Sequence, residues 1–395
     1  MLLLQVVVWT ALGLIVYTYA GFPLLLMLRS LRRRPCAKRD VTPTVSLIVI
    51  AHNEETSIAD KLDNVLSLDY PPDRLEVIVG SDGSDDATHA IVAQYANRGV
   101  VLCEFSRQGK IPALNATIPR ANSEILVFSD ANSMFLPDAL RQLVRPFADP
   151  CVGAVAGNQR YSSDHGNAAS LGERLYWGFD RQLKRMQSVA GNVTSATGAI
   201  HAVRRELVYA VPPGVSDDFV ISTRVIAQGY RLVFEPEAIA CEAVAPSDAA
   251  EFGRKARVIA RGLRGLWAVK ELFNPLRYGF YSLQILTHKL LRWSVIWLMF
   301  VLLAASAVLV GTAPLYNVLF VSQAAFYGCA LAGFFLRNTP LVNAAAFKLL
   351  ALPLYFCLVN FAALSGWLQC LSGRRLDVWS NTRSSTPHEP RLFSA

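Results

Sequence analysis

The sequence has few charged residues and no cysteine arrangement that would bind a metal. Charged side chains make up 17% of the 395 residues, whereas soluble domains carry about 25%. The seven cysteines are scattered, without Cys-x-x-Cys spacing and without histidines grouped around them. This pattern indicates isolated buried thiols and argues against both a disulfide framework and a zinc site.

The loops that bind nucleotides in two common enzyme classes are also missing. The sequence has no G-x-x-x-x-G-K-[ST] loop, and no G-x-G-x-x-G follows an expected strand. It therefore gives no support to phosphoryl transfer or to dinucleotide binding.

Long apolar runs are what the sequence has instead, and hydrophobic residues make up 53% of it. Residues 1–28 can cross a bilayer, which takes about 20 helical residues. Because the start, Met-Leu-Leu-Leu-Gln, lacks the basic residues of a signal peptide, we expect an uncleaved anchor. We expect a transmembrane region at 293–371, with runs at 293–310, 315–336 and 341–371, and a polar tail at 372–395.

Four arginines follow the first apolar run, at positions 29, 32, 33 and 34. Basic residues flank membrane spans on the cytoplasmic side, so we expect the next domain in the cytoplasm and the bilayer as a partner. A basic patch for nucleic acid is the alternative, but its position directly after a span argues against it. We therefore expect no nucleic-acid partner.

The side of the membrane on which the chain ends stays open. One span before the domain and three after it would place the arginine-containing tail outside, against the positive-inside rule. Two alternatives are open: a break of the last apolar run near Pro353 into a re-entrant pair, which would place the tail inside, or a weak failure of the rule in this chain.

Residues 43–250 are typical of an α/β domain. Short apolar runs that resemble buried strands alternate with helical patterns, which predicts βαβ units and a mostly parallel sheet. The expected strands are 44–51, 75–82, 99–105 and 124–130. Residues 251–292 are basic and amphipathic, and we expect them to form helices in the membrane interface.

Polar residues follow these strands directly. Asn53, Glu54 and Asp82 can contact a base or a ribose, or they can cap helices and close turns. Lys110, beside a loop glycine, can reach a phosphate oxygen. All of them would meet at the carboxyl edge of a parallel sheet, where ligands bind.

Asp130 and Asn132 follow the fourth expected strand, two residues apart. Two oxygen-bearing side chains at this spacing can point the same way. Together with a diphosphate they can hold Mg²⁺ or Mn²⁺, which favour oxygen ligands. An Asx-turn is the alternative.

The ordered set of these four stretches resembles the family-two inverting glycosyltransferases with a GT-A fold. The similarity is greatest to their membrane-embedded branch, which includes cellulose synthase-like, bacterial hyaluronan and chitin-oligosaccharide synthases. The resemblance covers about residues 43–270. It implies a GT-A nucleotide-sugar-binding domain joined to α-helical membrane spans.

The resemblance assigns roles to residues on the donor side of the site. Asn53 and Glu54 match the nucleotide pocket, Asp82 the aspartate that contacts uridine, and Lys110 the lysine near the donor diphosphate. The pair Asp130 and Asn132 matches the Asp-x-Asp motif that binds Mg²⁺ or Mn²⁺. Here an amide replaces the second carboxylate.

It also assigns roles on the acceptor side. Asp218 matches the catalytic aspartate, and we expect the neighbouring Asp217 to raise its pKa so that it accepts a proton more readily. These two residues also start an expected helix, which they could cap. Gly198 matches a glycine near the donor sugar and the acceptor end, and Asp217 is a second expected acceptor contact.

The most altered motif lies at 254–258. Processive relatives carry Gln-x-x-Arg-Trp there, and the tryptophan stacks on the acceptor sugar. Arg257 matches the arginine that contacts the diphosphate, whereas Arg254 and Val258 replace the glutamine and the tryptophan. We keep Arg254 as an expected acceptor contact. The missing tryptophan disfavours processive polymerisation.

The resemblance therefore implies transfer of a sugar from a UDP-sugar to a glycan or a lipid-linked acceptor. Transfer would occur at the cytoplasmic face of a bacterial inner membrane, with single or few additions. Two alternatives stay open. One is a processive synthase that also secretes its polymer, and the other is a membrane protein that only binds nucleotide.

Overall fold

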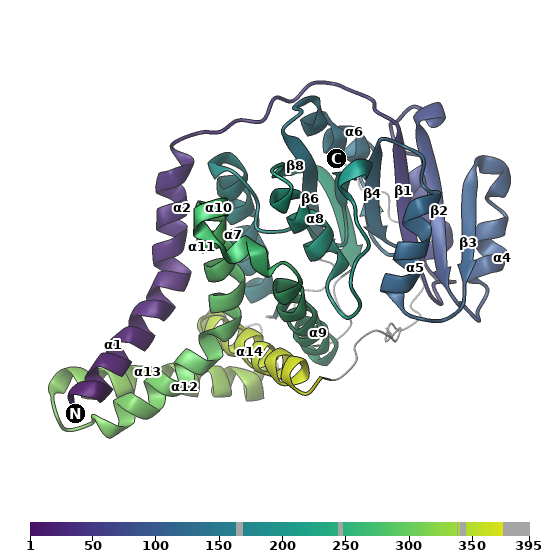
Figure 1. Cartoon of the computed structure of the whole chain (residues 1–395). Helices are drawn as coiled ribbons and strands as arrows, with labels where there is room; N and C mark the ends of the chain where they lie inside the picture. The colour runs from purple at the N-terminus through teal and green to yellow at the C-terminus, as the bar shows by residue number, and fades with distance from the viewer. Residues whose placement is uncertain (163–168, 244–247, 338, 340–344, 374–395) are drawn as a thin grey trace.

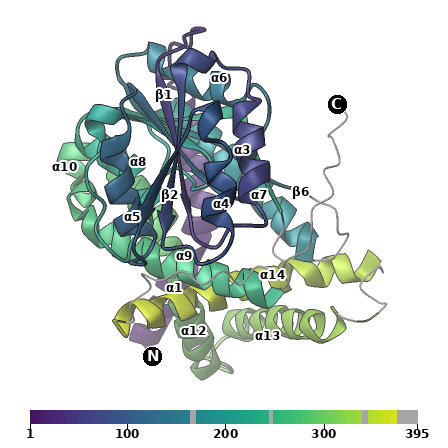
Figure 2. The ribbon, with the colours of Figure 1, turned by 90° about the vertical axis from the view of Figure 1, so that its right-hand side faces the viewer.

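The computed structural model describes residues 1–162, 169–243, 248–337, 339 and 345–373. It contains an α/β domain and a group of long apolar helices below it (Figure 1). Figure 2 shows the same division after a quarter turn, with helix α9 (Asp248–Ala268) between the two parts. The expected fold class is confirmed.

The domain is built on an eight-stranded sheet with the strand order β3-β2-β1-β4-β7-β6-β8-β5. The four strands expected from the sequence are parallel to one another, as predicted. The second half of the sheet is mixed, because β7 is antiparallel to β4 and β6, and β5 is antiparallel to β8. The strands are β1 (Val45–Ala51), β2 (Leu75–Asp82), β3 (Val100–Phe105), β4 (Ile125–Asp130), β5 (Met134–Phe135), β6 (Val152–Ser162), β7 (His201–Arg204) and β8 (Arg231–Ala243).

Helices cover both faces of this sheet. One face packs against α3 (Ile58–Leu66), α4 (Thr88–Ala93) and α6 (Ala139–Val144). The other packs against α5 (Lys110–Thr117), α8 (Asp217–Ala227) and α9. Helix α7 (Ala169–Ala190) follows β6, and the 3-10 helices are η2 (Pro72–Arg74), η3 (Ala96–Arg98), η4 (Ile118–Arg120), η5 (Arg145–Ala148), η6 (Arg205–Leu207) and η7 (Lys270–Phe273).

Among the residues that the structure describes, four helices are long and apolar enough to cross a membrane. The first, Leu2–Ser30, combines α1 (Leu2–Val16), a π-helical turn η1 (Tyr17–Gly21) and α2 (Phe22–Ser30). The second, Phe280–Val308, combines α11 (Phe280–Ile285), a π-helical turn η8 (Leu286–Leu291) and α12 (Arg292–Val308). The others are α13 (Pro314–Leu336) and Leu349–Leu371 within α14 (Ala345–Leu371), and a short helix α10 (Pro275–Tyr278) precedes the second.

The segment 280–292 is continuous with the second apolar helix, and its expected place in the membrane interface stays a prediction. Helix α14 runs through Pro353 without a break, so it does not form the re-entrant pair that was one of the alternatives. The polar tail at 374–395 lies outside the described residues.

Helix α9 is fixed closely on two sides. A Cβ added at Gly265 would lie 2.8 Å from the Phe219 ring of α8, and one at Gly262 would lie 2.4 Å from the Trp293 ring of α12. On α14, a Cβ at Gly366 would lie 2.9 Å from the Ala256 carbonyl oxygen of α9. These separations leave no room for a methyl group, so the glycines allow α9 to join the domain to the apolar helices.

The Gly366→Ala variant tests this contact. The added methyl group meets a backbone carbonyl that cannot rotate away, so we expect a loss of about 1–3 kcal/mol in the free energy of unfolding. Thermal unfolding of the detergent-solubilised protein should show a lower Tm. The control is Gly328→Ala in α13, where no atom lies within 4 Å of the added Cβ. Equal Tm values for the two variants would contradict the close packing of α9 on α14.

Candidate active site

The expected site residues lie at the carboxyl ends of neighbouring strands. Asn53 and Glu54 follow β1, Asp82 ends β2, and Asp130 ends β4. Lys110 begins α5, which packs on the same part of the sheet. The parallel arrangement of β1, β2 and β4 brings these side chains to one edge, as expected for a ligand site in an α/β sheet.

Lys110 joins the two halves of the site. Its Nζ lies 2.9 Å from Oδ1 of Asp130 and 3.1 Å from Oδ2 of Asp217. Burial opposes the charge of this lysine, but the two carboxylates outweigh it and raise the pKa of Lys110 above its usual range. Residues from β4, α5 and α8 therefore meet in one ion-pair cluster.

Gly198 lies directly against this cluster. A Cβ added there would lie 2.9 Å from Oδ2 of Asp130, closer than such atoms approach in proteins. A side chain at position 198 would therefore displace the Asp130 carboxylate. This contact explains why the segment before β7 has a glycine beside the site.

Asn132 supplies an oxygen that suits a cation. Its Oδ1 atom is buried, and no hydrogen-bond partner for it exists among the described residues. Buried polar atoms are normally paired, so such an atom is a candidate ligand for a metal or a bound molecule. Within the described ranges no three His, Cys, Asp or Glu residues group as a metal site. A cation beside Asp130 and Asn132 would thus take its remaining ligands from a diphosphate or from water, which suits Mg²⁺.

Asp82 is completely buried and holds the loop that precedes Lys110. Its carboxylate accepts hydrogen bonds from the backbone N–H groups of Gln108, at 2.8 Å, and Gly109, at 2.9 Å. The guanidinium of Arg107 lies 3.8 Å away. Asp82 therefore positions the start of α5, and its contact with uridine stays a prediction.

The loops after β1 and β2 are bound to each other. Asn53 has a left-handed backbone with φ of 52°, and its side chain donates to the Asp85 carboxylate and accepts from the Asp85 N–H at 3.0 Å. The N–H of Glu54 donates to Oγ1 of Thr88 at 2.9 Å. These bonds fix the edge of the site that the resemblance assigns to the nucleotide.

Asp217 and Asp218 begin α8 and point their carboxylates to different partners. Asp217 pairs with Lys110, whereas Oδ1 of Asp218 accepts from the Ser216 hydroxyl at 2.6 Å and from the Phe219 N–H at 2.8 Å. In the part of the chain that the structure describes, Oδ2 of Asp218 has no hydrogen-bond partner. The orientation of Asp218 is thus fixed through one oxygen while the other can accept a proton.

Arg254 and Arg257 lie on α9, one turn apart. Arg254 forms a bidentate ion pair with Glu251, with both N–O distances at 2.7 Å, and its guanidinium lies 5.8 Å from the Tyr161 ring centre. In the structure the N–H donors on one edge of the Arg254 guanidinium are therefore bound to a carboxylate of the same helix. Arg257 is half-buried.

Three buried ionisable residues near the site were not expected from the sequence. His201 on β7 donates from Nδ1 to the Thr197 carbonyl at 2.9 Å, and burial lowers its pKa despite the nearby Asp218 and Asp217. The pKa of Glu242 on β8 is raised by burial and by the charge of Asp130. The third, Lys61 on α3, is fully buried, and this burial lowers its pKa to about 7.

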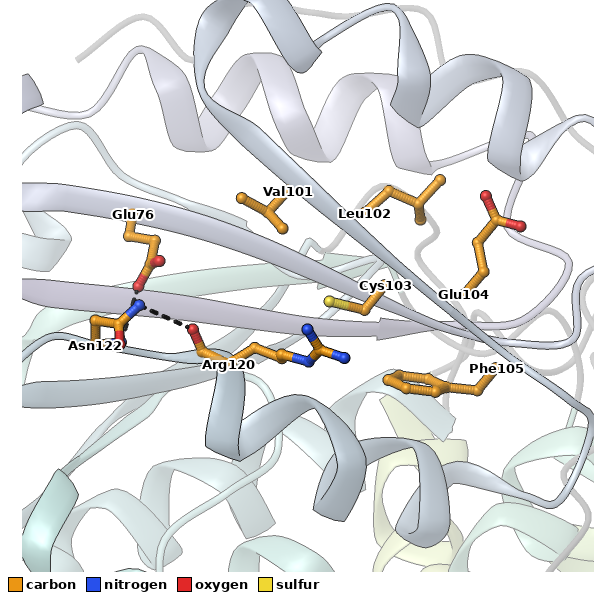
Figure 3. A pocket seen from close by; sticks show the side chains of 8 residues that line it. All are labelled: Glu76, Val101, Leu102, Cys103, Glu104, Phe105, Arg120 and Asn122. Atoms are coloured by element: carbon orange, nitrogen blue, oxygen red, sulfur yellow. Dashed lines mark hydrogen bonds between the residues drawn. The ribbon is translucent and has the colours of Figure 1, made fainter.

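The surface pocket in Figure 3 does not belong to this site. Its lining includes β3 residues 101–105 together with Glu76, Arg120 and Asn122. The Asn122 side chain donates to the Arg120 carbonyl at 3.2 Å, and its N–H donates to Glu76 at 3.2 Å. None of these residues belongs to the Lys110 cluster, so the pocket is separate from the candidate active site.

Part of the chain matches a known protein family. Residues 46–211 match the sequence profile described as Glycosyl transferase family 2. The chain carries a family-two glycosyltransferase domain. For residues 46–211 this match confirms the family that the ordered motifs resemble.

The relatives of this glycosyltransferase include curated polysaccharide synthases. It is 26% identical over 281 residues to a poly-beta-1,6-N-acetyl-D-glucosamine synthase of Staphylococcus aureus (strain COL), covering 69% of this chain and 67% of the relative. An enzyme of the same name from Staphylococcus epidermidis is 28% identical over 203 residues, covering 49% of this chain and 48% of the relative.

A solved structure supports the fold of the glycosyltransferase. The mannosyltransferase PcManGT from Pyrobaculum calidifontis, in complex with GDP-Man and Mn²⁺, matches with a TM-score of 0.68 and 24% sequence identity. The match covers 93% of this chain and 99% of that one. The likeness confirms a GT-A fold.

The Gly198→Ala variant tests the approach of Gly198 to Asp130. Because the methyl group would displace the carboxylate, we expect Mn²⁺ binding to weaken by about tenfold. Electron paramagnetic resonance of Mn²⁺ titrated into the protein measures this binding without requiring activity. Gly178→Ala, where nothing lies within 4 Å of the new Cβ, is the control and should bind Mn²⁺ as the wild type does. Wild-type binding by Gly198→Ala would contradict the placement of the cation beside Asp130.

Proposed function

We propose that the protein is an inverting glycosyltransferase that uses a nucleotide-diphospho-sugar, a UDP-sugar in the first instance. It transfers the sugar to a hydroxyl of a glycan or a lipid-linked acceptor at the cytoplasmic face of the membrane. The observation that carries this proposal is the Lys110 cluster, which joins Asp130 on one side to Asp217 on the other. A lysine in this position can bind the diphosphate between a cation site and the acid that faces the acceptor.

Asp218 is the base that accepts the proton of the attacking hydroxyl. In an inverting transfer the acceptor oxygen attacks from the face opposite the departing diphosphate, so one base on the acceptor side suffices. The bonds from Ser216 and the Phe219 N–H orient the carboxylate through Oδ1. Oδ2 is then available to the hydroxyl, while Asp217 stays paired with Lys110 and contacts the acceptor from its other side.

Asp130 and Asn132 would hold Mg²⁺ or Mn²⁺. A cation bound there supplies positive charge that stabilises the departing diphosphate. The buried, unpaired Oδ1 of Asn132 supports this assignment. Lys110, paired with Asp130, supplies additional positive charge there, and the resemblance assigns the same role to Arg257. The solved mannosyltransferase contains Mn²⁺, which makes this ion a reasonable first choice.

In this proposal Asn53, Glu54 and Asp82 bind the nucleotide, and Gly198 lies near the donor sugar. Both curated relatives are named as synthases of a polymer of N-acetylglucosamine. UDP-N-acetylhexosamines and UDP-hexoses are therefore the first donors to test. Arg254 can contact the acceptor only if it leaves Glu251.

The helices and the arginines support the proposed membrane placement. In the described part of the chain four helices are long and apolar enough to span, and the arginines after the first favour a cytoplasmic domain. We propose a bacterial inner-membrane location on this basis. The acceptor then arrives from the membrane side, near α9.

Single or few additions and processive synthesis are both compatible with this chemistry. The first is favoured by the stretch 254–258, where Val258 is exposed in the place of the stacking tryptophan. The second is favoured by the names of the curated relatives. We adopt the first as the proposal and processive synthesis with secretion as the second candidate.

Asp218→Asn tests the catalytic assignment and the non-catalytic alternative together. Loss of the base should reduce transfer by about 100-fold to 10,000-fold, while donor binding changes little, because the amide keeps the shape of the side chain. Release of free nucleoside diphosphate from a panel of nucleotide sugars with Mg²⁺ or Mn²⁺ measures both rate and donor choice.

Two further variants make this test sharper. Asp217→Asn separates the roles of the two acids, since it should weaken donor binding through Lys110. Asp73→Asn, on the exposed helix η2, should leave transfer unchanged. Full transfer by Asp218→Asn would contradict the assignment of the base, and no transfer by the wild type with any donor would favour the nucleotide-binding alternative.

Product length tests the mode of addition. Without a stacking platform at position 258, a growing chain is held weakly, so we expect short products from purified protein and nucleotide sugar. Gel separation or mass spectrometry of the products distinguishes the two candidates. Long polymer formed from the donor alone would overturn the proposal of few additions and support the processive candidate.

A further inference from the structure

A lysine is buried directly below the loop that carries Asp130 and Asn132. Lys61 belongs to α3, which covers the sheet with Ile58, Leu62 and Val65. The whole residue has no exposed surface. Lysine is almost never fully buried without partners, so its contacts indicate why it is there.

All the contacts of the Lys61 ammonium lie on the 129–135 loop. Nζ donates to the Ser129 hydroxyl at 2.8 Å and to the Ser133 carbonyl. It also lies 4.1 Å from the centre of the Phe135 ring, which suits a cation–π contact. The three donor directions of the ammonium thus hold the residue before Asp130, the residue after Asn132, and the end of the loop.

The hydrogen bond from Lys61 to Ser129 also connects the lysine to the segment around Gly198. The Ser129 hydroxyl donates to the Ala199 carbonyl at 2.9 Å, so its oxygen is left to accept from Lys61. Ala199 follows Gly198, where an added Cβ would lie 2.9 Å from Oδ2 of Asp130. Lys61, Ser129 and Ala199 therefore connect both segments that border the Asp130 carboxylate.

Two further residues hold the same loop. Asn64, one turn after Lys61, accepts from the Phe135 N–H at 2.7 Å and donates to the Phe135 carbonyl at 2.8 Å. From the opposite side, the Ser133 hydroxyl donates to Glu242, which also accepts from Gln159 at 2.7 Å. The loop is therefore bound from α3 and from β8, and it closes with a bond from the Ser133 N–H to the Asp130 carbonyl at 3.2 Å.

A neutral side chain could not replace all of these contacts. The direct partners of Lys61 are a hydroxyl, a carbonyl and a ring, and each is uncharged. Burial disfavours the ammonium, whereas the charges of Asp130 and Glu242 favour it. The amine in this place lies near the acids Asp130 and Glu242 and fixes the loop through its hydrogen bonds to Ser129 and Ser133 and its contact with the Phe135 ring.

We propose that Lys61 is a positioning residue, which holds the 129–135 loop so that the oxygens of Asp130 and Asn132 face one cation. This rests on the proposed function, because the cation and the nucleotide are part of it. Lys61 itself touches neither, since it lies below the loop. Its effect is on the metal-dependent part of nucleotide binding.

The test compares nucleotide affinity with and without metal in the full-length protein. The probe is UDP or GDP, whichever binds the wild type, in Mn²⁺ or in EDTA, by isothermal titration calorimetry. The ratio of the two Kd values isolates the metal-dependent part. In Lys61→Met we expect this ratio to fall by about tenfold, with the Kd in EDTA within about twofold of wild type.

A merely structural role would weaken binding equally with and without Mn²⁺, and that result would overturn the proposal. The matched control is Asp63→Asn on the same helix, which bears an exposed carboxylate paired with Arg98 at 2.8 Å and should keep the wild-type ratio. If Lys61→Met does not fold, Ser129→Ala carries the test, because it keeps the lysine and removes the link to Ala199. An unchanged ratio in Ser129→Ala would also overturn the proposal.

The result also separates this proposal from the proposed function. Wild-type protein that binds neither nucleotide more tightly in Mn²⁺ would overturn the metal-dependent function and the role of Lys61 together. Wild-type protein with a clear Mn²⁺ effect, and Lys61→Met with the same effect, would overturn the role of Lys61 alone.

Discussion

The ion-pair cluster around Lys110 is the interaction on which the site depends. It connects the parallel half of the sheet, through Asp130 on β4, to the mixed half, through Asp217 at the start of α8. Without the lysine, two carboxylates would face each other in a largely buried place, which is unfavourable. Asp82 places this lysine by holding the backbone before α5, so a buried acid that touches no other part of the cluster still determines its geometry.

Two further ionisable residues, Lys61 and Glu242, lie close to Asp130 of this cluster. Lys61 and Glu242 hold the Asp130 loop from opposite sides, one by its carbonyl and one by its serine hydroxyl. Buried polar networks are stable only when every member is paired, so each of these residues depends on the others. Asn132 is the exception, and its unpaired oxygen lies in the loop that the network fixes. This contrast between a fixed loop and one unpaired oxygen is what a preorganised cation site requires.

Part of this arrangement could be predicted from the sequence. Asp82, Asp130 and Lys110 follow apolar runs, and the parallel order of strands brings such positions together whatever the details of packing. The pair of Arg254 with Glu251 and the bonds of Asp82 to the next loop were not predicted, because side-chain partners depend on packing. Lys61 was missed for a related reason. Lys61 lies on the same helix face as Ile58, Leu62 and Val65, where an apolar residue is the usual choice, and only the fold shows which loop atoms accept its hydrogen bonds.

The apolar helices illustrate a second limit. The segment 280–292 contains His288, Lys289 and Arg292. Because these basic residues interrupt the apolar pattern, the sequence did not predict that the helix continues into α12. In the structure Lys289 lies 5.6 Å from the Phe219 ring and 5.3 Å from the Trp293 ring. Phe219 follows Asp218 and also meets Gly265 of α9. The start of α8 is therefore held by a helix that is a candidate span and by the helix that joins it to the domain. It follows that the proposed catalytic base takes its position partly from the apolar helices, so the candidate active site and these helices form one structural unit.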